Sequence, residues 1–135
     1  MKISTKARYG LKVMLELAFG GKELYPVSDL ATVSGTTVAY LEQVMPLLKK
    51  AGLVKSTRGA FGGYSLMKPA SEITVGSILR ALEDELEFVD CIKSDCSNKC
   101  TCQSYYVWER IYKAINESVE HILLSDLDRT KENEI

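Results

Sequence analysis

The sequence is poor in histidine and lacks the long apolar runs of a membrane protein. Among 135 residues the only histidine is His121, which lies in the predicted last helix among several apolar residues. There an imidazole has a surface or interface role more often than a catalytic one. No apolar stretch approaches the roughly 20 residues that span a bilayer, and residues 1–20 lack the apolar core and cleavage site of a signal peptide. We therefore expect no membrane partner and a cytoplasmic location.

Cysteine is absent except in one stretch, CIKSDCSNKCTC, which holds Cys91, Cys96, Cys100 and Cys102. Thiols in the cytoplasm are kept reduced, so a tight cluster there is more often a metal or redox site than a disulfide framework. Thiolates are soft ligands that suit iron–sulfur clusters and zinc. The spacing is too short for a zinc ribbon, which needs well-separated CxxC pairs. The residues favour an iron–sulfur cluster, and zinc and a thiol redox sensor stay open as alternatives.

The net charge of −1 conceals two halves of opposite sign. Residues 1–75 carry ten Lys or Arg and five Asp or Glu, a net charge of +5. The remainder carries seven basic and thirteen acidic residues, a net charge of −6. A basic front half suggests that one face meets a polyanion.

The first third of the chain has the apolar periodicity of three helices. The first is predicted over residues 4–19, and Ser4 or Thr5 can cap its start. The second begins with Ser28 as a plausible N-cap, and the third is capped by Thr36 or Thr37 and ends near residue 50. Two helices joined by a tight turn with a glycine form a helix-turn-helix.

A hairpin is predicted directly after these helices, with strands over residues 53–56 and 64–67. Between the strands lies TRGAFGG, whose three glycines permit a tight tip that comes close to another backbone. A hairpin in this place is the wing of a winged helix. We therefore predict a mainly α fold with a small β-hairpin, in which residues 1–73 form a winged helix-turn-helix DNA-binding domain.

The second half is predicted to be a linker helix, a cysteine loop and a long last helix, together residues 74–125. Thr74 caps the linker helix, predicted over residues 75–87. The last helix, predicted over residues 105–124, has apolar residues on more than one face, which makes it a candidate C-terminal dimerisation helix. Residues 126–135 are charged and are predicted to form a disordered tail.

The predicted third helix has side chains suited to reading DNA, since its first turns would enter the major groove. Gln43 can pair with adenine, and Glu42 can accept from the amino group of cytosine. Hydroxyl groups bind phosphates, and Arg58 suits a minor groove or a phosphate. The candidate DNA-binding residues are Lys6, Tyr9, Ser28, Thr36, Thr37, Ala39, Tyr40, Glu42, Gln43, Arg58, Gly59, Phe61 and Gly62.

Three parts of the sequence resemble the IscR and NsrR family of bacterial winged-helix regulators, the Rrf-two family. They are MKISTKARYGLKVMLELA, then TTVAYLEQVMPLLKKAGLVKSTRGAFGGYSL, and the cysteine cluster before a helix that contains tryptophan. The resemblance covers nearly the whole chain. It implies a homodimer that binds imperfect palindromes in double-stranded DNA. For many members it also implies an iron–sulfur cluster whose state changes which promoters are occupied.

The resemblance also implies a set of cluster ligands. Such members use three cysteines spaced C-x5-C-x5-C and a fourth ligand that is not cysteine. Cys96 and Cys102 have this spacing, whereas Cys91 is one residue nearer to Cys96. The expected cofactor is a 2Fe–2S cluster held by these three cysteines.

The fourth ligand departs from the family pattern. IscR-like members use a histidine three residues after the last cysteine, where this chain has Tyr105. NsrR-like members use an aspartate in the first helix, where this chain has Arg8. Cys100 is the candidate substitute.

The sequence therefore predicts a homodimeric transcription regulator whose operator binding is modulated by an iron–sulfur cluster at Cys91–Cys102. It would sense iron or iron–sulfur supply, redox state or nitric oxide. The open alternative is a cluster-free winged-helix repressor, controlled by a protein partner from cysteine metabolism or by thiol oxidation. An enzyme would need an acid–base group near the cysteines, and the sequence offers no convincing one.

Overall fold

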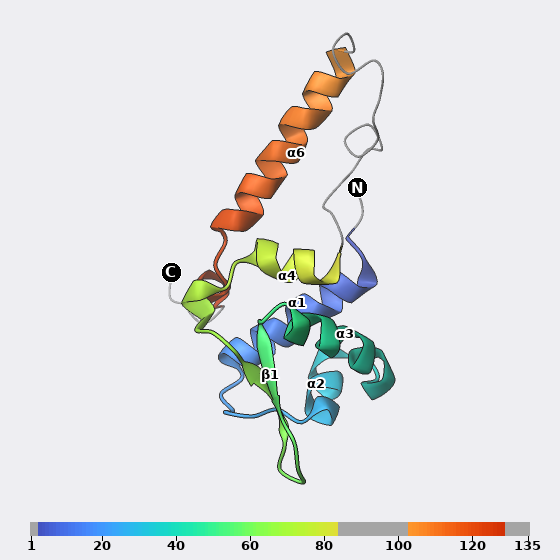
Figure 1. Ribbon diagram of the computed structural model, residues 1–135, viewed down its shortest axis with the longest axis vertical. Coiled ribbons are helices and arrows are strands. Elements are labelled where there is room, and N and C mark those ends of the chain that lie inside the picture. Colours follow the sequence, from blue (N-terminus) through green and yellow to red (C-terminus); the bar gives the residue numbers. More distant parts are fainter. Residues whose placement is uncertain (1–2, 84–102, 129–135) are drawn as a thin grey trace.

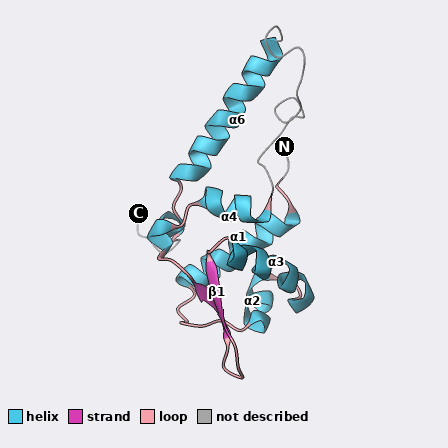
Figure 2. Ribbon diagram, in the orientation of Figure 1, coloured by secondary structure: helices cyan, strands magenta, loops and turns pink. Residues whose placement is uncertain are grey.

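The computed structural model describes residues 3–83 and 103–128 (Figure 1). This part of the chain is mostly helical with one antiparallel hairpin, which confirms the predicted fold class (Figure 2). The elements in chain order are α1 (Thr5–Phe19), α2 (Val27–Ser34), α3 (Val38–Lys50), β1 (Val54–Thr57), β2 (Gly63–Leu66), the 3-10 turn η1 (Ala70–Glu72), α4 (Val75–Leu82), α6 (Gln103–His121) and the 3-10 turn η2 (Leu124–Leu127). None of the helices described is long and apolar enough to cross a bilayer.

Hydroxyl side chains begin three of the helices, as the sequence predicts. The Ser4 hydroxyl accepts a hydrogen bond from the Ala7 amide at 3.1 Å and caps α1. Thr37 caps α3 and Thr74 caps α4 in the same way. Each such bond satisfies a backbone donor that the first turn of a helix leaves without a partner.

The prediction that Ser28 caps α2 is wrong. The N-cap is Pro26, whose carbonyl accepts from the amides of Asp29 and Leu30 at 3.1 and 3.2 Å. The proline side chain has no hydrogen-bond acceptor, so α2 begins without a side-chain cap. Ser28 lies exposed in the first turn.

One apolar core holds α1 to α4 together. α1 contributes the buried residues Val13 and Met14, and α3 contributes Leu41, Val44 and Leu48. Burial of each such side chain contributes about 1.5–3 kcal/mol. α4 packs on both α1 and α3 and so lies on the winged-helix body. The predicted domain boundary at residue 73 stays a prediction.

The hairpin is fastened to the loop before α2. β1 pairs with β2 from Val54 opposite Leu66 to Thr57 opposite Gly63. Tyr25 then exchanges two backbone hydrogen bonds with Tyr64, at 2.9 and 2.7 Å. A Cβ on Gly63 would collide with the carbonyl oxygen of Tyr25, so glycine permits this close approach.

The end of α4 differs from the prediction, which extended this helix to residue 87. Glu83 has extended backbone angles, so α4 ends at Leu82. The Glu83 carboxylate accepts a hydrogen bond from the Ser4 amide at 2.5 Å, which ties this end of α4 to the start of α1.

The predicted disordered tail, residues 126–135, begins instead with ordered structure. Asp126 and Leu127 belong to η2, where Leu124 is fully buried and Leu127 packs against the core. Residues 129–135 lie outside the described residues.

α6 is fastened to the body at its C-terminal end and projects away from it (Figure 1). The Val75 amide donates to the Ile122 carbonyl at 2.8 Å, and the Leu124 amide donates to the Ile73 carbonyl at 2.8 Å. An ion pair between Arg80 and Glu120 joins α4 to α6 nearby.

Replacing Ser34 by alanine should leave the free energy of unfolding unchanged or raise it by up to about 1 kcal/mol. The Ser34 side chain is 4% exposed, and within the described residues its hydroxyl has no hydrogen-bond partner. Urea unfolding of Ser34→Ala measures the change. Thr37→Ala is the matched control, and it should lose about 1 kcal/mol because it removes a bonded cap. A comparable loss in Ser34→Ala would mean that the hydroxyl has a partner in the folded protein.

Candidate nucleic-acid interface

The first turns of α3 present small and polar side chains on one exposed side. Leu41, Val44, Met45 and Leu48 face the core, whereas Ala39, Glu42 and Gln43 are exposed. Of the thirteen candidate residues, Ser28, Thr37, Ala39, Glu42, Gln43, Arg58, Gly59 and Phe61 are exposed, whereas Lys6, Tyr9, Thr36, Tyr40 and Gly62 are half-buried.

An aromatic pair joins α1 to the start of α3. The rings of Tyr9 and Tyr40 meet edge to face, with centroids 5.6 Å apart. The Lys12 ammonium lies 5.0 Å from the centre of the Tyr9 ring, within the range of a cation–π contact. The structure thus brings Tyr9 and Tyr40 together, and Lys6 lies about one turn earlier in α1. The sequence gives no signal for this pairing, since the two tyrosines are far apart in the chain.

The tip of the hairpin is a closed turn with an exposed aromatic ring. The Gly62 amide donates to the Gly59 carbonyl at 3.0 Å, with Ala60 and Phe61 between them. Gly59 has φ of +118°, a conformation that favours glycine. The Phe61 side chain is 95% exposed.

A groove of about 570 Å³ separates the hairpin from the start of α2. It is lined by hairpin residues between Ser56 and Tyr64, by Pro26 and Val27, and by Lys49. The Lys49 ammonium donates to the Ser56 hydroxyl at 2.8 Å. A helix N-terminus next to basic side chains favours an anionic occupant such as a phosphate. Sequence reasoning missed Lys49 and Pro26, which only the folded approach of hairpin and helix brings together.

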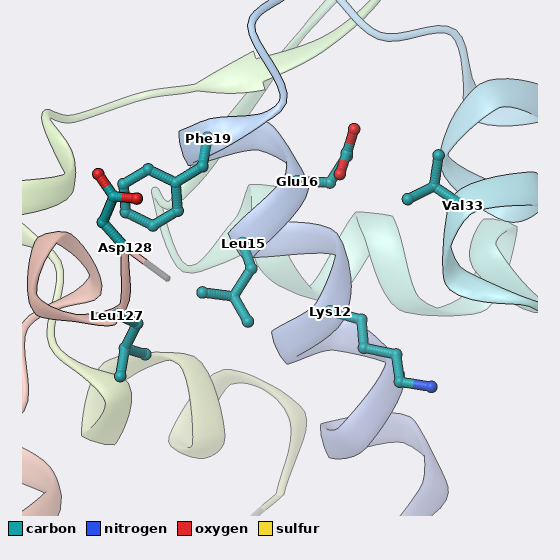
Figure 3. A pocket seen from close by; sticks show the side chains of 7 residues that line it. All are labelled: Lys12, Leu15, Glu16, Phe19, Val33, Leu127 and Asp128. Carbon is teal, nitrogen blue, oxygen red and sulfur yellow. The ribbon is translucent and has the colours of Figure 1, made fainter. Parts of the chain in front are cut away.

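A second hollow, of about 350 Å³, lies between α1, α2 and η2 (Figure 3). Leu15, Phe19, Val33 and Leu127 make most of its wall, and Lys12, Glu16 and Asp128 complete it. These seven lining residues include no serine, cysteine or histidine, so they do not form a nucleophile–base pair of the kind used in covalent catalysis.

α6 carries an exposed stripe that its own body leaves uncovered. Val107 is 49% and Ile111 is 38% exposed, and the small residues Ala114 and Ser118 are exposed as well. These four positions follow one another at spacings of four, three and four residues, the repeat of a helix–helix seam. Elsewhere on α6 the hydrogen bond and charge of Glu109 raise the pKa of Lys113.

The four candidate cluster ligands, Cys91, Cys96, Cys100 and Cys102, lie outside the described residues. Across residues 3–83 and 103–128 no group of three or more His, Cys, Asp or Glu is arranged to hold a metal. Arg8, at one family position for a fourth ligand, is exposed on α1, and its guanidinium donates to the Thr5 hydroxyl at 3.5 Å.

Known proteins match this chain over nearly its whole length. The Rrf2 (Rrf-two) family, described as an iron-dependent transcriptional regulator, matches residues 3–130. Protein rrf2 of Nitratidesulfovibrio vulgaris is 38% identical, with 96% of this chain and 88% of that protein covered. The HTH-type transcriptional regulator IscR of Vibrio atlanticus is 34% identical, with 100% and 78% covered.

Two solved structures have the same fold. CymR (YrzC), the global cysteine regulator of B. subtilis, superposes with a TM-score of 0.79 at 38% identity, covering 96% of this chain and 98% of that one. IscR of T. potens superposes with a TM-score of 0.77 at 38% identity, covering 99% and 90%.

Proposed function

This chain belongs to the Rrf2 family of transcriptional regulators, and from that premise we propose that it is a homodimer that binds a pseudo-palindromic operator and responds to an iron–sulfur cluster at Cys91–Cys102. The family confirms the prediction of a transcription regulator rather than an enzyme. The observation that carries the DNA-binding part is the exposed side of α3 next to a basic hairpin. A cytoplasmic location accompanies this proposal.

The exposed side of α3 is the part that would enter the major groove. Glu42 and Gln43 extend from it and have the functional groups for base edges. Thr37 and Tyr40 lie at its start, where a hydroxyl reaches the phosphates that flank a major groove. The Tyr9–Tyr40 contact fixes this end of α3 against α1, so the reading side chains are held by a packed helix.

The hairpin and the start of α2 would hold the DNA backbone. Arg58 is exposed at the hairpin, and the groove beside it ends at the N-terminus of α2. Phosphate contacts of this kind fix register and orientation, whereas base contacts select the sequence.

The exposed stripe on α6 supports a homodimer. A solvent-facing seam of Val107, Ile111, Ala114 and Ser118 is self-complementary in a two-fold pair, and its small residues let two helices approach closely. Because α6 is fastened to the body by the Arg80–Glu120 ion pair and by backbone hydrogen bonds, pairing of α6 would set the distance between the two α3 helices. That distance determines the spacing of the operator half-sites.

The chemistry of the four cysteines fits an iron–sulfur cluster, since this chain offers four soft thiolate donors within twelve residues. Cys91, Cys96 and Cys102 would hold it, with Cys100 as the fourth ligand. When bound, such a cluster supplies sensitivity to iron supply, oxidants or nitric oxide. The cysteines fall in sequence between Glu83, which is bonded to Ser4, and the start of α6. Ligation would therefore bias how α6 and the body are held, with a coupling of about 1–3 kcal/mol.

A second candidate is a cluster-free regulator controlled by a protein partner or by thiol oxidation. It is favoured by the similarity to CymR, whose B. subtilis form is named a global cysteine regulator. The structure of the oxidized form of Staphylococcus aureus CymR also superposes, with a TM-score of 0.72 at 37% identity. If control is by thiol oxidation, an oxidant would join two of the four cysteines in a disulfide, and a reductant would restore the thiols.

Glu42→Ala should relax base preference at one operator position by about 1–3 kcal/mol, because an acceptor for the cytosine amino group is removed. The measurement compares the sequences that wild type and variant enrich from a random double-stranded DNA library. Glu72→Ala, on the exposed surface of η1, is the control and should enrich the wild-type sequences. Unchanged preference in Glu42→Ala would place the reading surface elsewhere.

Ile111→Glu should weaken the dimer by about ten-fold or more, because it buries two unpaired carboxylates in the seam. Sedimentation equilibrium of the purified chain measures the dissociation constant. Glu117→Gln, which is exposed on another side of α6, should leave it unchanged. An unchanged dissociation constant in Ile111→Glu would contradict the proposal that α6 pairs along this seam.

Anaerobically purified protein should be coloured and should contain iron and sulfide in comparable amounts. Visible absorbance with iron and sulfide assays tests this, and Cys91→Ala and Cys100→Ala should each reduce the iron that is retained. Full retention in Cys100→Ala would remove it as the fourth ligand. A colourless protein after reconstitution would favour the cluster-free candidate and leave the DNA-binding proposal standing.

A further inference from the structure

The exposed ring of Phe61 lies in the hairpin tip, close in the chain to the candidate DNA-binding residues Arg58, Gly59 and Gly62. A single exposed apolar side chain is ordinary on a protein surface and needs no explanation by itself. Phe61 differs from the other exposed apolar residues because it lies at the tip of a projecting hairpin, at the opposite end of the body from α6 (Figure 1).

The backbone beneath the ring forms a hydrogen-bonded turn. The Gly62 amide to Gly59 carbonyl bond closes the turn around Phe61. A Cβ on Gly62 would collide with the carbonyl oxygen of Thr57, so the hairpin tip is tightly folded. A side chain on a hydrogen-bonded turn loses less entropy on binding than one on an open loop.

The surroundings of the ring favour a polyanion. Between Leu53 and Met67 the only charged residues are Lys55 and Arg58, both basic and both exposed. The groove that extends from this hairpin ends at the N-terminus of α2, the positive end of that helix. An exposed apolar side chain close to a basic residue such as Arg58 is suited to enter a minor groove and separate two base pairs.

We propose that Phe61 is a minor-groove wedge that presses against a flexible pyrimidine–purine step and bends the operator. This inference rests on the proposed function, since it requires the hairpin to lie on DNA. Arg58 would neutralise a phosphate, and Phe61 would select DNA that is easily deformed. Sequence preference would then extend to positions where no side chain forms a hydrogen bond with a base.

The test uses the full chain and DNA that wild type enriches from a random double-stranded library. Phe61→Ala should bind this DNA about ten-fold more weakly, because an apolar ring is no longer buried. It should also bend the DNA less, as measured by energy transfer between dyes at the two ends of the fragment. Phe61→Leu keeps an apolar wedge and should keep most of the bend. The ring is exposed, so thermal melting of both variants should match wild type.

Arg58→Ala is the matched control for charge. It should lower the slope of log affinity against log salt concentration by about one and leave the bend in place. Phe61→Ala should leave this slope unchanged, since no charge is removed.

Three outcomes would overturn the wedge. If Phe61→Ala binds and bends the DNA as wild type does, the wedge is refuted, and the proposed function as a DNA-binding regulator is unaffected. Weaker binding with an undiminished bend would make Phe61 a simple contact. If wild type enriches no DNA at all, the wedge and the proposed function fail together.

Discussion

Burial of one face of α1 is the constraint on which the rest of the structure depends. Ala7, Gly10, Val13, Met14 and Leu17 form this face, and α1 contacts α2, α3, α4, β2 and η2. The candidate reading helix, the hairpin and the segment that anchors α6 are therefore all positioned by the same apolar surface. A change on that face would disturb both the candidate reading helix and the attachment of α6, whereas changes at Glu42 or Phe61 leave the core intact.

Much of the fold follows from local chemistry and could be predicted. Ser4, Thr37 and Thr74 cap helices because a hydroxyl at that place satisfies a free amide, and the alternation of buried and exposed residues in α3 follows its apolar spacing. The failures have tertiary causes. α4 stops at Leu82, whereas Leu86 continues its apolar pattern, and the predicted tail begins with η2 because the Leu124 amide bonds to the Ile73 carbonyl.

The candidate site also has features that the sequence predicts and features that only the folded chain shows. The outward side of α3 and the glycine-rich hairpin tip are visible in the sequence, since both depend on neighbouring residues. The Tyr9–Tyr40 pair, the bridge between Tyr25 and Tyr64 and the place of Lys49 in the groove are not, because each joins segments that are distant in the chain. The sequence predicts a broad apolar surface on the last helix, but only the structure shows which of these residues pack on the body and which stay exposed. There Val119 and Ile122 pack on the body and Val107 and Ile111 stay exposed.

The attachment of α6 at one end gives this helix the mechanics of a lever arm. Its 19 residues, at 1.5 Å each, span about 28 Å from the body to the far end. A tilt of about ten degrees at the Arg80–Glu120 end would move the far end by about 5 Å, which exceeds the 3.4 Å rise of one base pair. If two chains paired along α6, that helix would be held by its partner, and the same small rotation near Gly76 and Glu120 would turn the body instead. The outer side of α3 would then move by an amount set by its own distance from this attachment. Side-chain size at that attachment would thus set the angle between α6 and the body, the quantity on which the proposed spacing of operator half-sites depends.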